Sequence, residues 1–174
     1  MSLADKLKER GFKAEASNDG EWQPYNGVYL CSIKTLRPEY DEKNAADFIQ
    51  LELDINEVIS GDMKRESKFP AFRKRYYTDW ENPNEDQLDN VQELANVIFT
   101  GTAVDLDFDS KEAFKIQAEM LIGREIYINA WGHAFDKKQD GTPIPEDQRK
   151  AMQFWKAWKK SVAEKKRTAG SVAF

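Results

Sequence analysis

Basic and aromatic side chains alternate in two short segments of this chain. In the first segment, Arg73, Arg75 and Tyr77 occupy every second position. Cations can follow a phosphate backbone, and flat rings give nucleic-acid bases a surface on which to stack. These residue types therefore predict binding of single strands, provided that they share one face. The candidate contact residues, including three from an earlier segment, are Lys34, Arg37, Tyr40, Arg73, Arg75, Tyr77, Trp80, Trp155, Lys156, Trp158 and Lys159.

Alternate residues of a strand point to opposite faces, so odd and even positions (the two parities) of residues 72–77 lie on different faces, and only one of these faces could meet a ligand. One parity holds Arg73, Arg75 and Tyr77, and the other holds Lys74 between two aromatic residues. Two arginines are harder to bury than one lysine, whose stem can lie on the core while its head reaches water. We therefore expect Arg73, Arg75 and Tyr77 to face the ligand.

A cluster of acids offers a different chemistry. Asp105, Asp107 and Asp109 have the alternate spacing of a calcium-binding loop. Such a loop needs Gly at its sixth position and Glu at its twelfth, where this chain has Ser110 and Ile116. Helix capping explains Asp109. A metal-dependent nuclease centred on these three acids stays open as an alternative.

Other catalytic motifs are missing from the sequence. The chain has one histidine, His133, and one cysteine, Cys31, so neither a histidine cluster nor a CxxC pair can form. No glycine-rich phosphate loop is present. We therefore expect a protein that is not an enzyme, without a cofactor, a resident metal or a small-molecule substrate.

The net charge of −5 argues against a nucleic-acid partner, but the charges are segregated. Residues 64–75 carry six positive charges and one negative, and residues 149–167 carry eight and one. Residues 79–119 carry eleven acids and two lysines. Association depends on the local field, so the two basic segments could form one binding surface. The alternative is that these charges only keep the surface solvated.

The composition indicates a globular chain, with 40% hydrophobic and 33% charged residues. No apolar stretch reaches the roughly 18 residues of a membrane span, and the first residues lack an apolar secretory core. We therefore expect a cytoplasmic protein without a membrane partner. The absence of repeats and of linker composition predicts one domain over residues 1–162, including a short helix at 2–11, followed by a flexible tail at 163–174.

Periodicity predicts the elements that must position the candidate residues. Alternation predicts strands over 28–36, 47–61 and 68–78. Periods of three and four predict two helices, one capped by Asn82 and stopped by Gly101, the other running from Asp109 to Gly123. A fourth strand is expected over 124–135. Residues 151–162 fit either a helix or a strand, and we favour the strand.

Three strands, a helical segment and two more strands follow the chain order of the OB-fold, a five-stranded Greek-key barrel. The expected fold class is therefore α+β, mainly β, with the helices between strands three and four. In such a barrel a ligand lies across strands two and three. Here it would be flanked by loops at 37–46 and 136–148.

The sequence resembles the OB-fold single-stranded DNA-binding proteins of phages and related mobile elements. The resemblance covers roughly residues 25–160. It depends on these short motifs: Gly27-Val28-Tyr29 with Ile33, Phe48-Ile49-Gln50-Leu51-Glu52-Leu53 with Gly61, Leu121-Ile122-Gly123-Arg124, Ile126-Tyr127-Ile128, and Lys156-Ala157-Trp158-Lys159 after Gly141.

The resemblance implies a cofactor-free protein that coats single-stranded DNA, with little sequence preference, during replication or recombination. Many such proteins end in an acidic tail with a terminal Phe that recruits partners. Phe174 is present here, but the residues before it are basic and neutral. RNA as a ligand and a homo-oligomer stay open, as does a protein-interaction or structural module built on the same barrel.

Overall fold

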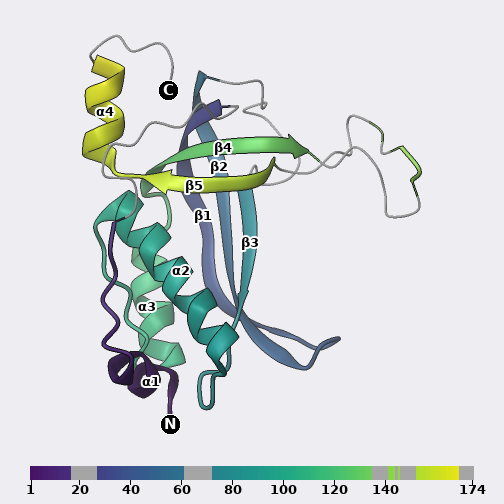
Figure 1. Ribbon diagram of the computed structural model, residues 1–174, viewed down its shortest axis with the longest axis vertical. Helices are drawn as coiled ribbons and strands as arrows, with labels where there is room; N and C mark the ends of the chain where they lie inside the picture. Colours follow the sequence, from purple (N-terminus) through teal and green to yellow (C-terminus); the bar gives the residue numbers. More distant parts are fainter. Residues whose placement is uncertain (17–26, 61–71, 135–140, 144, 146–151, 169–174) are drawn as a thin grey trace.

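The computed structural model describes residues 1–16, 27–60, 72–134, 141–143, 145 and 152–168. Within these residues, four helices and five strands are labelled in Figure 1, in the order in which they follow along the chain. They are α1 (Leu3–Glu9), β1 (Gly27–Asp41), β2 (Ala46–Ser60), β3 (Phe72–Tyr77), α2 (Glu85–Thr102), α3 (Lys111–Leu121), β4 (Glu125–Ala134), β5 (Met152–Trp158) and α4 (Lys160–Thr168).

The five strands form one antiparallel sheet in the order β3-β2-β1-β4-β5, which curls into a half-barrel (Figure 1). The edge strands β3 and β5 are not paired with each other, and α2 contacts both of them. The ring of Trp155 on β5 also reaches Phe72 on β3, with centroids 5.8 Å apart. The expected α+β class, with helices between the third and fourth strands, is confirmed. The strand favoured for 151–162 is confirmed over 152–158, but residues 160–162 belong to α4 instead.

The interior of the half-barrel is filled from alternate positions of the long strands. On β2, Ile49, Leu51, Leu53 and Ile55 are buried, as the alternation in the sequence predicts. On β1 the alternation is interrupted, because Ile33 pairs with Leu53 whereas Thr35 pairs with Glu52. Lys34 is the extra residue of a β-bulge, and the bulge shifts the parity of everything that follows it.

The β1–β2 hairpin is longer than the sequence suggested. The expected loop at 37–46 is wrong, because pairing continues to Asp41 opposite Ala46 and the turn occupies residues 42–45. Pro38 lies within β1, beyond the residues 27–32 that pair with β4. A strand tolerates proline at an edge that needs no N–H donor, so Pro38 does not end β1.

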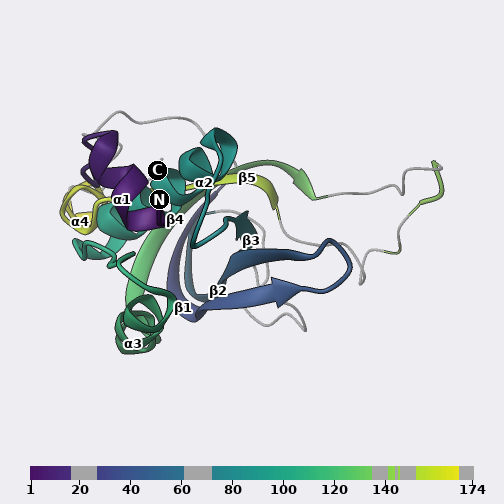
Figure 2. The same cartoon turned by 90° about the horizontal axis from the view of Figure 1, so that it is seen from below.

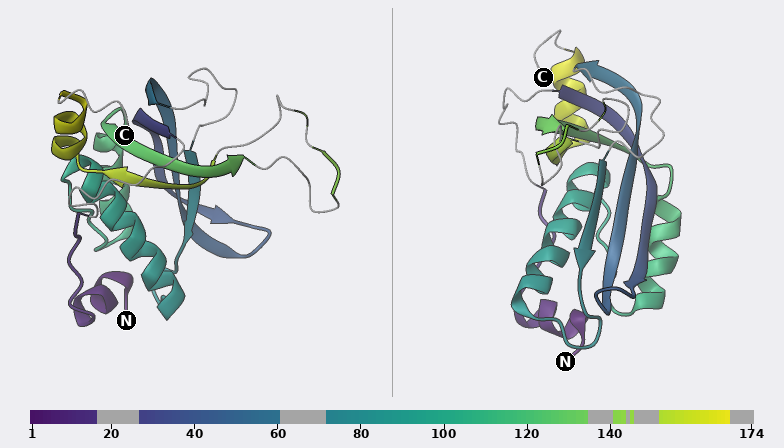
Figure 3. Two further views of the ribbon diagram at one scale, coloured as in Figure 1. Left: turned by 45° about the horizontal axis from the view of Figure 1, so that its top comes forward. Right: turned by 90° about the vertical axis from the view of Figure 1, so that its right-hand side faces the viewer.

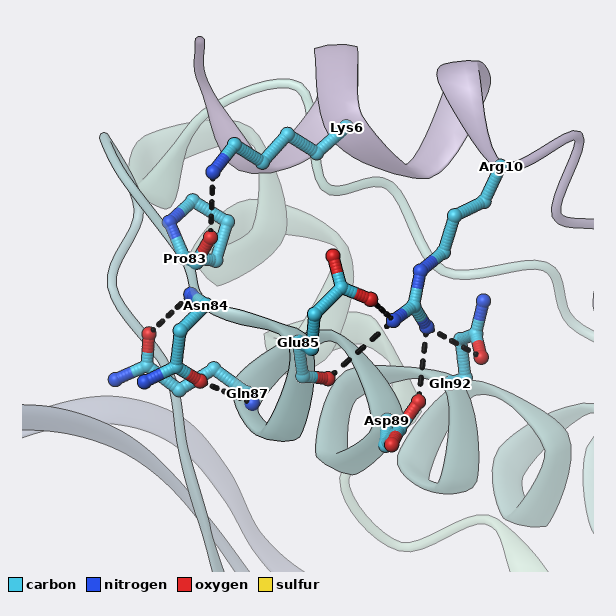
Figure 4. Close-up of polar contacts among 8 residues, drawn as sticks. All are labelled: Lys6, Arg10, Pro83, Asn84, Glu85, Gln87, Asp89 and Gln92. Atoms are coloured by element: carbon cyan, nitrogen blue, oxygen red, sulfur yellow. Dashed lines mark hydrogen bonds and ion pairs between the residues drawn. The ribbon is translucent and has the colours of Figure 1, made fainter.

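The start of α2 differs from the expected cap at Asn82. The N–H groups of Glu81 and Asn82 bond the side chain of Asp79, which forms a turn before the helix. Asn84 is the N-cap instead, and it forms a reciprocal capping box with Gln87 (Figure 4).

The N-terminal helix α1 is held against the first turns of α2 (Figure 4). The Nζ of Lys6 donates to the carbonyl of Pro83 at 2.7 Å. The guanidinium of Arg10 contacts the carboxylates of Glu85 and Asp89. Together with buried Leu3, these contacts explain why this short helix is ordered on the domain.

The end of α2 also departs from expectation, because Gly101 does not stop the helix. The helix continues to Thr102, and Ala103 adopts the left-handed conformation with φ 58°. Gly101 faces β4, where an added Cβ would lie 2.3 Å from both Cδ1 and Cγ1 of Ile126. The glycine is therefore needed for close helix–sheet contact rather than for a turn.

The variant Gly101→Ala should have a lower free energy of unfolding than the wild type. Overpacking a core costs about 1–3 kcal/mol, against about 1 kcal/mol gained from helix propensity. We expect the cost to prevail because the contact includes Cγ1 of Ile126, close to the backbone. Urea unfolding of Gly101→Ala, Ile126→Ala and the double variant tests this. Strictly additive effects would contradict a clash between the two residues.

Helix α2 lies beside β3 and α3 lies beside β1, and both pack on the same core (Figure 3). The buried side of α3 joins an aromatic cluster of Trp80, Phe108 and Phe114. The rings of Trp80 and Phe114 meet edge to face, with centroids 5.6 Å apart, and Phe108 stacks on Phe114 at 5.4 Å. Ser110 caps α3, so the expected start at Asp109 is displaced by one residue.

The last described element, α4, corrects the expected flexible tail at 163–174. Residues 163–168 are helical, and Ala163 is buried against Val28 and Tyr127. The helix was missed because two neighbouring residues, Val162 and Ala163, supply its apolar contacts and the other residues of α4 are polar. Residues 169–174 lie outside the described part of the chain. Within the described residues, no helix is both long enough and apolar enough to cross a membrane.

Candidate nucleic-acid interface

The outward face of β2 and β3 carries the predicted cationic residues. Arg73 and Arg75 are exposed, whereas Phe72 and Tyr76 are buried in the core. Lys74 has the core parity, but its Nζ reaches Glu93 on α2 at 2.8 Å. The expected parity of this strand is therefore confirmed: the two arginines point outward, and the single lysine escapes along the core surface.

The pairing of β2 with β3 places side chains of β2 next to those of β3 on the outward face. Gln50 pairs with Arg75 and Phe48 pairs with Tyr77. The guanidinium of Arg75 lies 4.6 Å from the centroid of the Phe48 ring, and its Nε donates to Oε1 of Gln50 at 3.2 Å. The Phe48 and Tyr77 rings are tilted against each other at 5.3 Å. Arg75 is thus positioned by an aromatic face and a hydrogen bond.

Asp41 orients the tyrosine at the end of this row. The Tyr77 hydroxyl donates to Oδ2 of Asp41 at 2.9 Å, and Nδ2 of Asn44 donates to the same oxygen at 2.8 Å. The backbone N–H groups of Lys43 and Asn44 bond the other oxygen, closing the hairpin turn. These hydrogen bonds, the one from Tyr77 above all, hold the pKa of Asp41 below its usual value.

The variant Tyr77→Phe should raise the pKa of Asp41 toward its ordinary value, because it removes the strongest donor. The pKa of Asp41 is lower in the folded protein than in the unfolded chain, so ionised Asp41 stabilises the fold at any pH above its unfolded pKa. This stabilisation is lost as the pH falls through the folded-state pKa. The variant should therefore lose less stability on acidification. NMR titration of the Asp41 carboxyl carbon measures the shift. Tyr40→Phe, which removes an exposed hydroxyl from the same strand, should leave it unchanged.

The interface carries both signs of charge. Arg37 pairs with Gln50 across the strands and therefore lies on the outward face, where its Nε bonds Glu39. Glu52, opposite Arg73, is a further acid on this face. Within the described part of the chain, Arg73 has no ion pair or hydrogen bond. The face therefore has separate cationic points rather than a continuous basic groove.

Three predicted contact residues lie apart from this face. Lys34 is exposed at the bulge of β1. Tyr40 pairs with Asp47 and so has the parity opposite to Arg37, although it is 56% exposed. Trp80 is only 7% exposed, and its ring is enclosed by the aromatic cluster. The stacking role expected for Trp80 is wrong for this structure, because neither of its faces is free to receive a base.

The candidate residues of the C-terminal segment come from β5 and the residue after it, and β5 is at the opposite edge of the sheet from β3. Trp155 is partly buried and packs on the core. Lys156 pairs with Asn129 and has the opposite parity to Trp155. Lys159 lines a hollow of about 750 Å³ at the C-terminal end of α2. The backbone of Trp158 pairs with Tyr127, and its side chain is outside the described part of the structure.

The acidic cluster has structural partners. The Asp107 carboxylate accepts the N–H of Asp109, and Gln117 bonds the backbone of both Asp105 and Asp107. Among the residues that the structure describes, no three His, Cys, Asp or Glu side chains are grouped so that they could hold a metal ion. The cluster thus organises the approach to α3.

Sequence reasoning did not select Phe48 and Gln50 as site residues. Their position on the outward parity of β2 was readable from the alternation, but both are nearly fully buried. The Nε2 group of Gln50 has no hydrogen-bond acceptor in the described part of the chain. Their role became visible only through the register with β3, which brings Arg75 and Tyr77 over them.

No protein-family model and no curated protein matches this chain.

Proposed function

We propose that this protein binds single-stranded DNA, with little sequence preference, across the outward face of β2 and β3. One observation carries the proposal: Arg73, Arg75 and Tyr77 emerge side by side on one face of the curved sheet, with Arg37 on the same face. Guanidinium groups can neutralise successive phosphates, and an aromatic side chain can receive a base. The barrel-like sheet is compatible with the OB-like architecture that the sequence resembles.

The fixed position of Arg75 supports this function further. Its guanidinium is already held over Phe48 and against Gln50, so less side-chain freedom is lost when a phosphate binds. Glu39 and Glu52 on the same face weaken its attraction for phosphates, so Arg37, Arg73 and Arg75 supply the electrostatic part of the proposed binding.

A fluorescence titration with labelled oligo-dT, at several salt concentrations, tests the proposed function. The logarithm of the affinity should fall linearly with the logarithm of salt, at about −0.7 per neutralised phosphate. A mixed-sequence oligonucleotide should bind within about tenfold of oligo-dT, because stacking tolerates any base. Association that is insensitive to salt, or a preference for duplex DNA, would count against this function.

A further inference from the structure

Helix α3 exposes large apolar side chains on the side that faces away from the sheet. Ile116 is 66% exposed and Met120 is 77% exposed, and their spacing of four residues makes them neighbours on the helix surface. Ile122, directly after the helix, is 46% exposed. Figure 2 shows α3 at the periphery of the molecule beside β1. We call these three residues the α3 stripe.

This exposure is not required by the fold. The core side of α3 is supplied by Phe114, Ala118 and Leu121, all buried. The opposite side of a helix that covers a core is usually polar. Adjacent exposed apolar side chains with a polar border are instead typical of interaction sites.

Acidic side chains border the α3 stripe on one side. Glu112 and Glu119 lie one helical turn before and after Ile116, and both are exposed. Lys115 is an exposed cation on the same side of the helix, and Lys111 is paired with Asp47 at 3.3 Å.

Acids lie along the other border of the α3 stripe as well. Gln117 is one turn from Met120, and its amide bonds the carbonyl of Asp105 and the N–H of Asp107 at 2.8 and 2.7 Å. This holds the acidic loop of residues 105–109 beside the helix. Segment 105–121 as a whole carries five acids and two lysines.

The charges around the α3 stripe distinguish between two possible occupants, a second copy of this chain and a different partner protein. In a symmetric pair of α3 helices, an antiparallel arrangement would set Glu112 against Glu119 of the second copy. A parallel arrangement would set these glutamates against the loop at 105–109. Both arrangements place acid on acid, and like charges across an interface are unfavourable. A partner with positive charges around its apolar contacts avoids this conflict.

We propose that the α3 stripe and its acidic border form a docking surface for a basic amphipathic helix of a partner protein. Apolar side chains of that helix would cover Ile116 and Met120, and its lysines or arginines would pair with Glu112 and Glu119. The surface is separate from the arginine face of β3, so this inference does not depend on the proposed DNA binding.

Synthetic peptides can test the docking surface without knowledge of the natural partner. The probe is a labelled Leu/Lys/Ala peptide with leucines on one helical face, and its control is a scrambled peptide of the same composition. Backbone amide shifts of the full-length protein should change within residues 112–122. The variant Ile116→Ser/Met120→Ser should weaken binding at least about tenfold, because it removes the central apolar contacts.

Matched variants separate the surface from general acidity of the protein. Glu112→Gln/Glu119→Gln should weaken binding and reduce its salt dependence, whereas Glu42→Gln and Val58→Ser should do neither. Equal binding of the scrambled peptide, shifts confined to another surface, or self-association that Ile116→Ser/Met120→Ser abolishes would overturn the proposal. Oligo-dT binding by the Ile116→Ser/Met120→Ser variant should equal that of the wild type, so the two functions can fail independently.

Discussion

Replacing Trp80 with alanine should lower the free energy of unfolding by about 3–5 kcal/mol, the range for deleting a large aromatic side chain from a core. Trp80 contacts Phe108 and Phe114 within the cluster that α3 closes. The backbone carbonyl of Trp80 also accepts the N–H of Leu3, which ties α1 to this region. Urea unfolding followed by circular dichroism gives the loss.

This prediction distinguishes a core role of Trp80 from a contact role. Trp80→Phe keeps a ring in the cluster and should cost much less than Trp80→Ala. Oligo-dT affinity, expressed per folded molecule, should be unchanged in both variants. A fully stable Trp80→Ala protein that loses DNA binding would instead return Trp80 to the interface, as the sequence pattern first suggested.

The variant Arg73→Ala/Arg75→Ala should lose two phosphate contacts. The slope of log affinity against log salt should become less steep by about 1.4, which corresponds to about 25-fold weaker binding near 0.1 M salt. Both side chains are exposed, so the fold should persist apart from a small loss of about 0.5–1 kcal/mol from the contact between Arg75 and Phe48. Titration with oligo-dT at several salt concentrations measures the slope.

Lys74→Ala/Lys115→Ala provides the charge-matched control. It also removes two positive charges, but Lys74 points to the other face of β3 and is paired with Glu93, and Lys115 lies on α3. Its salt slope should stay close to that of the wild type. If both double variants reduced the slope equally, the long-range field of the protein would explain binding, and the outward face of β3 would lose its assignment.

The sequence by itself determined the alternation of the sheet and the orientation of β3. Leu51 and Leu53 had to face inward because a strand with apolar residues at every second position can bury only one side. The same rule, with the cost of burying two guanidinium groups, pointed Arg73 and Arg75 outward. These features are local, since they depend only on the order of residues along one strand.

Tertiary structure decided which of the remaining candidates could meet at one site. The bulge at Lys34 sets the parity of Arg37, and a bulge is defined by the register with the neighbouring strand. Whether a tryptophan is stacked in a core or presented to a ligand depends on segments distant in the chain, as Phe114 shows for Trp80. Burial and register arise from contacts between elements, so they could not be deduced from the spacing of residues within any single element.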